Sequence, residues 1–133
     1  MKASGSGTIK FASVFLLLGG IVNIGLMTAI LLNGGYEQIF DDFNIMAAFS
    51  AALAYLIGLL QIIGSFIGFK YGSQVDKAKT IIKMGMVLIV ATIIWFIPEL
   101  VTDYQTLNWY VYAYSVLIPI LYYVGGKQNR ISN

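Results

Sequence analysis

The chain has 133 residues, 59% of them hydrophobic and 11% charged, with a net charge of +2. Soluble globular domains carry about 25% charged residues, so this composition indicates one membrane-embedded domain. Histidine and cysteine are absent, which excludes disulfides, thiolate metal sites and the commonest general base. We therefore expect a non-enzymatic protein without a metal or cofactor.

The charged residues divide between the two sides of four apolar runs. The basic residues precede the first run, surround the gap between the second and third, and follow the fourth: Lys2, Lys10, Lys70, Lys77, Lys79, Lys83, Lys127 and Arg130. Five of the six acidic residues occupy the other two gaps: Glu37, Asp41, Asp42, Glu99 and Asp103. The positive-inside rule makes the basic ends cytoplasmic. We predict an all-α membrane protein, a four-transmembrane-helix up-down-up-down bundle with N-terminus and C-terminus cytoplasmic.

The first span is predicted at about residues 9–32, within a single transmembrane domain covering 1–133. This run is longer than the roughly 7–15 apolar residues of a signal peptide, so we expect it to be retained. Asn33, Gly34 and Gly35 should end the helix, because glycine accepts the left-handed conformation of a helix stop. An outer loop at 33–43 follows.

The second span, predicted at 44–69, carries a continuous stripe of small or polar residues. At spacings of three and four, the stripe consists of Ala47, Ala51, Ala54, Gly58, Gln61, Ser65, Gly68 and Gly72. Membrane helices associate through van der Waals packing and hydrogen bonds, which such a helix-packing seam favours. The neighbouring helix could belong to this chain or to a partner, and the same holds for the GxxxG pair of Gly64 and Gly68.

The third and fourth spans are predicted at 80–101 and 108–124, with a cytoplasmic loop at 70–79 and an outer loop at 102–107. Ser73, followed three residues later by Asp76, is typical of a capping box for the third helix. Aromatic residues at both ends of 108–124 resemble the belts found at membrane interfaces. Lys127 and Arg130 follow this span, so its end is predicted to be cytoplasmic.

Few polar side chains lie within the predicted spans. Asn23, Gln61 and Thr92 are nearest the middle of the bilayer, and Glu99 lies near its outer edge. Two interpretations remain open: these groups hydrogen bond between helices, or they line a polar conduit. Counting along the helices from the cytoplasmic side places Asn23 and Thr92 within about one turn of each other and Gln61 about two turns lower, so Asn23 and Thr92 could meet directly.

Two segments carry a resemblance to a known group: IIGSFIGFKYGSQVDKAKTIIKMG at 62–85 and LIPILYYVGGKQNRISN at 117–133. They resemble parts of small four-span membrane proteins of Gram-positive bacteria, a group without an assigned activity. The resemblance implies a multi-pass protein of the bacterial plasma membrane and adds no chemistry.

The function expected from these patterns is that of an accessory, regulatory or immunity-type subunit acting through helix–helix packing. Its partners would be the lipid bilayer and either another membrane protein or further copies of the chain. The alternative is a minimal oligomeric channel or transporter for a small solute or cation, and a holin-like pore former is a third possibility. Nucleic-acid binding is not expected, because the basic residues do not form a stripe along one surface.

Overall fold

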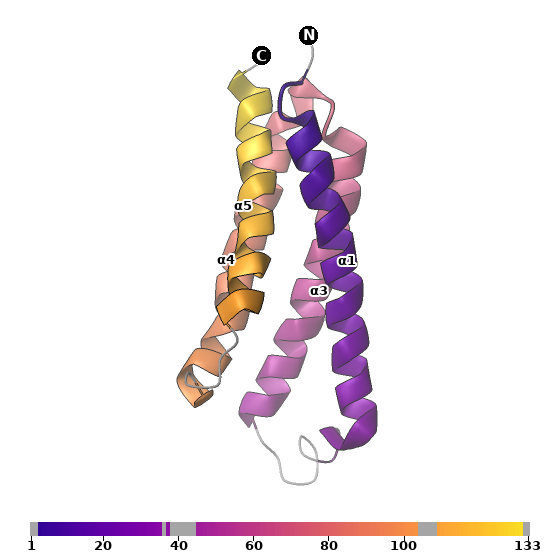
Figure 1. The fold of residues 1–133 in the computed structure, drawn as a ribbon, viewed down its shortest axis with the longest axis vertical. Helices are drawn as coiled ribbons and strands as arrows, with labels where there is room; N and C mark the ends of the chain where they lie inside the picture. The colour runs from indigo at the N-terminus through magenta and orange to yellow at the C-terminus, as the bar shows by residue number, and fades with distance from the viewer. Residues whose placement is uncertain (1–2, 36, 38–44, 104–108, 132–133) are drawn as a thin grey trace.

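The computed structural model describes residues 3–35, 37, 45–103 and 109–131, and all its regular elements there are helical (Figure 1). In chain order they are α1 (Ser6–Ile30), the π-helical turn η1 (Leu31–Gly35), α3 (Ile45–Tyr71), the 3₁₀ turn η2 (Val75–Lys77), α4 (Ala78–Asp103) and α5 (Trp109–Ile131). Three segments are long and apolar enough to cross a membrane: Ser6–Gly34, Ala48–Tyr71 and Val75–Ile97. The chain is thus a bundle of four long helices with the character of a membrane protein.

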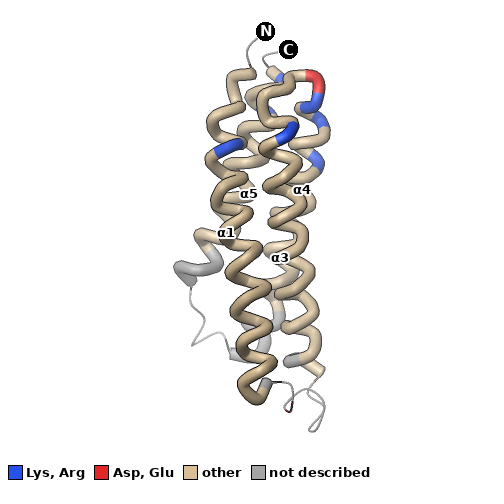
Figure 2. Tube along the Cα trace, turned by 90° about the vertical axis from the view of Figure 1, so that its right-hand side faces the viewer, with Lys and Arg blue, Asp and Glu red and all other residues tan. Residues whose placement is uncertain are grey.

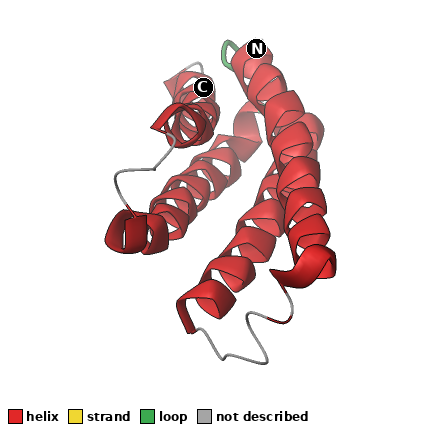
Figure 3. Ribbon diagram, turned by 60° about the horizontal axis from the view of Figure 1, so that its bottom comes forward, coloured by secondary structure: helices red, strands yellow, loops and turns green. Residues whose placement is uncertain are grey.

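The four helices form a closed ring. α1 packs against α3 and α5, while α4 packs against the same two helices from the opposite corner. Both chain ends lie at one end of the bundle (Figure 1). Toward the other end, the α4–α5 pair diverges from the α1–α3 pair, as seen in Figures 1 and 3. The two pairs therefore lie closest together in the half of the bundle that contains the termini.

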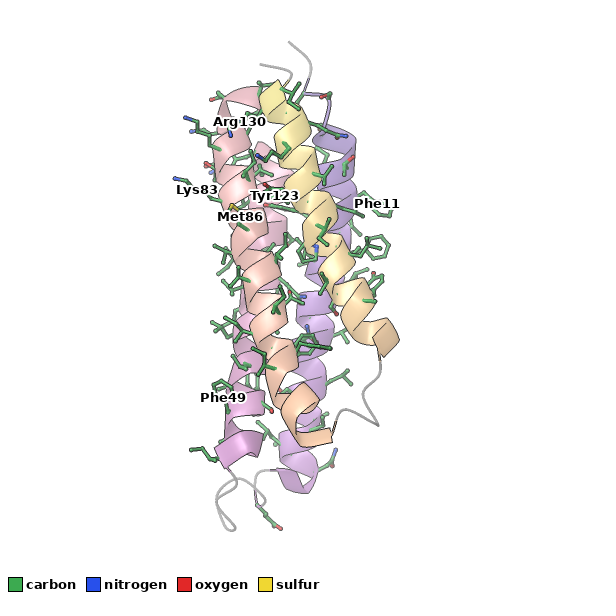
Figure 4. The ribbon with its side chains drawn as sticks, turned by 90° about the vertical axis from the view of Figure 1, so that its left-hand side faces the viewer. Phe11, Phe49, Lys83, Met86, Tyr123 and Arg130 are labelled. Atoms are coloured by element: carbon green, nitrogen blue, oxygen red, sulfur yellow. The ribbon has the colours of Figure 1, made fainter. Side chains whose placement is uncertain are left out.

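The core of that half is apolar. Its buried cluster draws on α1, α4 and α5: Ile9, Ala12, Leu16, Ile81, Leu88, Ile118 and Tyr122. Large apolar side chains also cover the outside, and Phe11, Phe49 and Met86 point away from the bundle in Figure 4, each about half exposed. Soluble monomers rarely expose such extensive apolar surface, whereas a lipid environment accommodates it.

The predicted stop after the first helix appears as a change in backbone conformation. Asn33 leaves helical geometry, and Gly34 takes a φ of 104°. Only glycine adopts this conformation without steric cost, so Gly34 turns the chain out of α1.

Two local features differ from expectation at the end that contains the termini. The 3₁₀ turn before α4 has Gln74 at its N-cap with no side-chain cap, so the predicted capping box at Ser73 is not formed. The Ser73 hydroxyl instead lies 2.9 Å from the Ser6 hydroxyl. Helix α5 also continues past residue 124, through the Gly-Gly pair, to Ile131.

The continuation of α5 follows from packing. A Cβ on Gly125 would lie 2.6 Å from the Cγ1 of Ile9, and one on Gly126 would lie 2.9 Å from the Cγ2 of Ile81. These glycines therefore bring α5 close to α1 and α4 rather than ending the helix.

Candidate functional site

The small-residue seam of α3 lies inside the bundle. Its members with described side chains are all buried: Ala51, Ala54, Gly58, Gln61, Ser65, Gly68 and Gly72. The side chain of Ala47 lies outside the described part of the chain. The seam is therefore covered within a single chain.

Helices α1 and α3 approach closely where two glycines face each other. A Cβ on Gly20 would lie only 2.7 Å from the carbonyl oxygen of Gly58, and a Cβ on Gly58 would lie 3.2 Å from the carbonyl oxygen of Gly20. The two backbones are in direct contact, and Ile24 and Ile62 pack on either side. This crossing explains why the seam has glycine at its centre.

The GxxxG pair of α3 serves two different neighbours. A Cβ on Gly64 would meet Leu88 and Met84 of α4, whereas a Cβ on Gly68 would meet Ser13 of α1 and Tyr122 of α5. The Tyr122 hydroxyl donates to the Gly64 carbonyl oxygen at 2.8 Å. The motif thus contributes to packing within one chain, at the centre of the ring.

The polar side chains of the predicted conduit are engaged in hydrogen bonds. Asn23 Nδ2 donates to Gln61 Oε1 at 2.9 Å, and a Cβ on Gly19 would be in ordinary contact with the same oxygen, at 3.4 Å. The Thr92 hydroxyl is fully buried and donates to the Leu88 carbonyl oxygen of its own helix at 2.7 Å. Asn23 pairs with Gln61 instead of Thr92 because α1 adjoins α3 while α4 occupies the opposite corner.

Other buried polar side chains are also hydrogen bonded. Ser65 donates to Ile62 O at 2.6 Å and Ser13 to Ile9 O at 2.7 Å. Among the described residues, no buried side-chain nitrogen or oxygen lacks a hydrogen-bond partner. The side chain of Glu99 lies outside the described part. Of the candidate conduit residues, Asn23, Gln61 and Thr92 therefore contribute to the packing of the helices.

A buried polar link that the sequence did not suggest joins three segments beside the termini. Asn129 on α5 is fully buried; its Nδ2 donates to Gly72 O at 2.9 Å, and its Oδ1 accepts from the Gly5 amide at 2.7 Å. The neighbouring Ser4 hydroxyl donates to the Gln128 carbonyl oxygen. The four-residue spacing of Gly125 and Asn129 on one helical face was the available signal.

The basic residues gather at this same end (Figure 2). Lys70 and Lys77 lie 5.2 and 5.6 Å from the ring centroid of Tyr71, and Lys127 lies 5.5 Å from that of Tyr123. Lys83 and Arg130 are near the same end in Figure 4. Such cation–π contacts hold the lysine side chains beside these tyrosine rings.

A pocket of about 450 Å³ lies at the opposite end, between the end of α1 and the facing part of α3. Its wall consists of Thr28, Leu31, Leu32, Gly34, Glu37 and Tyr55. The hydroxyls of Thr28 and Tyr55 are 2.8 Å apart and join the two helices there. The pocket combines an apolar surface with a few oxygen atoms, as small-ligand sites do.

Comparisons with protein families, with curated proteins and with solved structures gave no match to this chain. Within the described residues, no three histidine, cysteine, aspartate or glutamate side chains gather where they could hold a metal ion. The residues that the structure brings together are the α3 seam, the Asn23–Gln61 pair, the Asn129 link and the pocket beside Tyr55.

Proposed function

We propose that this protein is a non-enzymatic, multi-pass membrane protein that serves as an accessory, regulatory or immunity-type subunit. The observation that carries the proposal is that the polar groups within the predicted spans hydrogen bond inside the chain. Asn23 is bonded to Gln61, and Thr92 to its own helix. Polar groups that hydrogen bond within the protein stabilise a bundle. A solute path instead requires polar groups that face water or substrate.

The seam of α3 is occupied by α1 and the other helices of the same chain, so it is not the surface for a partner. A partner would instead contact the outward apolar faces, such as those that present Phe11 on α1 and Met86 on α4. Substitutions such as Gly58→Leu and Gly68→Leu would then disrupt the monomer itself rather than a complex alone.

The proposed topology has four spans, including α5, with both chain ends in the cytoplasm and the protein in the plasma membrane. The described lysines and arginine cluster beside the chain ends, and this supports the proposed orientation (Figure 2). Because the chain has no cysteine, single substitutions report topology cleanly. An impermeant maleimide should label Glu37→Cys in intact cells and Ser73→Cys only after permeabilisation; the reverse pattern would reject the orientation.

The experiment that tests the function is native mass spectrometry of the protein extracted gently from its own membrane. A stoichiometric membrane-protein partner would support the accessory role. A homo-oligomer without other proteins, combined with solute flux in reconstituted liposomes, would overturn that role and favour the channel or transporter. Replacing Gln61 with leucine in the same liposomes would then test whether the flux depends on the interior polar pair.

A further inference from the structure

The pocket between α1 and α3 has polar groups whose hydrogen-bonding roles can be worked out. The Thr28 hydroxyl has one proton, which it donates to the Ile24 carbonyl oxygen at 2.8 Å. At the 2.8 Å contact with Tyr55, Thr28 must therefore accept, and the Tyr55 hydroxyl must donate. The Tyr55 oxygen can therefore accept a further hydrogen bond, but its hydroxyl has no second proton to donate.

The charged group in the wall of the pocket is also an acceptor. Glu37 lines the pocket, and an ionised carboxylate only accepts hydrogen bonds. The described lysines and arginine lie at the other end of the bundle, as Figure 2 shows, so none of them neutralises this carboxylate. The side-chain oxygens of Glu37 and Tyr55 together favour a ligand that is both cationic and rich in N–H donors.

The remaining wall is apolar and open. Leu31, Leu32 and Gly34 contribute to it. The volume of about 450 Å³ lies within the range of about 300–1,000 Å³ that is usual for small-ligand sites. A ligand that fills the pocket therefore has an aliphatic part in addition to its cationic group.

We propose that this pocket binds a primary amine carried on an aliphatic chain. The ammonium group donates to the Glu37 carboxylate and to the Tyr55 oxygen, and the chain lies against Leu31 and Leu32. Either an ethanolamine phospholipid or a soluble alkylamine supplies this chemistry. The site goes beyond the accessory role, because amine binding does not require a protein partner.

The test compares ligands that differ only in their N–H donors. The purified full-length chain in detergent is titrated with phosphatidylethanolamine and with phosphatidylcholine of identical acyl chains, and bound lipid is counted by native mass spectrometry. Octylamine and octyltrimethylammonium form the soluble pair. We expect the primary amine of at least one pair to bind about tenfold more tightly, the effect of about one charge-assisted hydrogen bond.

The outcomes separate the two sources. Preference within the phospholipid pair assigns the site to a lipid headgroup, and preference within the alkylamine pair alone assigns it to a soluble amine. Equal binding within both pairs overturns the proposal, because a quaternary ammonium has the charge but no N–H donor.

Substitutions of the pocket residues test whether the amine binds in this pocket. Glu37→Gln and Tyr55→Phe should each reduce primary-amine binding by about tenfold. Tyr114→Phe is the control: it removes a hydroxyl from an exposed tyrosine on α5 that does not line the pocket. Circular dichroism checks that each variant folds, and undiminished binding by folded Glu37→Gln would overturn the assignment to this pocket.

Discussion

The contact between Gly20 and Gly58 makes a quantitative prediction about two alanine substitutions on the same helix. In Gly20→Ala the new methyl group would lie 2.7 Å from the Gly58 carbonyl oxygen and from Ile62 Cγ1. At Gly25, five residues further along α1, a methyl group would meet no atom within 4 Å. The pair therefore separates the effect of packing from the effect of removing a helical glycine.

The expected magnitudes follow from these distances. Ordinary contacts begin near 3.4 Å, so the backbones at Gly20→Ala must separate by several tenths of an ångström along a crossing that cannot be relieved by rotating a side chain. Such overpacking costs about 1–3 kcal/mol. Replacing glycine by alanine within a helix contributes up to about 1 kcal/mol in the opposite direction. Gly25→Ala should therefore be neutral or stabilising, and Gly20→Ala should be destabilising.

Thermal unfolding of both variants in the same detergent, followed by circular dichroism at 222 nm, measures this difference. The melting temperature of Gly20→Ala should fall below that of the unmodified chain, while Gly25→Ala should match or exceed it. Equal stability of the two variants would refute the claim that the backbones touch at this crossing.

Three further predictions test the polar contacts by the same unfolding assay. Asn129→Leu should destabilise the bundle by about 1–3 kcal/mol, because it leaves buried backbone groups without partners; an unchanged melting temperature would contradict this link. A double-mutant cycle of Asn23→Ala and Gln61→Ala should give a coupling of about 0.6 kcal/mol, the average for hydrogen bonds between membrane helices, and additive effects would argue against the bond. Tyr122→Phe should cost about 0.5–1.5 kcal/mol, whereas Tyr114→Phe should change stability little.

The sequence predicted the close packing of α3 but not its neighbour. Small residues at spacings of three and four indicate where a helix can approach, because the approach depends only on side-chain size along one face. The identity of that neighbour depends on the order of the helices around the ring. Short connections make consecutive helices adjacent, yet they do not decide which pair lies across a diagonal.

The partner of Asn23 illustrates the same limit. Depth along a helix can be counted from the sequence, and this count favoured Thr92. The observed bond to Gln61 depends on α1 and α3 sharing an edge of the ring. Depth was therefore less decisive than adjacency.

Glycine was ambiguous in the sequence for a related reason. Gly34 and Gly125 both follow an apolar run; Gly34 was interpreted as part of a helix stop, and the last span was predicted to end just before Gly125. Gly34 takes a positive φ, whereas Gly125 continues α5 against Ile9. A missing Cβ permits either a turn or a close contact, and only the neighbouring helix decides between them. The buried hydrogen bonds of Asn129 were not predicted, because the last helix was expected to end before this residue.

The closure of the ring by α5 has a consequence for assembly. The bond between Gly5 and Asn129 joins residues 124 positions apart, so it should form after the contacts within the α1–α3 and α4–α5 hairpins. Before that step, α1 presents Ile9 to any α5 nearby, and a second copy offers the same Gly125 and Asn129. Reciprocal exchange of the α4–α5 pair would preserve every closing contact in a dimer. Co-expressing two differently tagged chains would detect such exchange, whereas mixing them after purification would not.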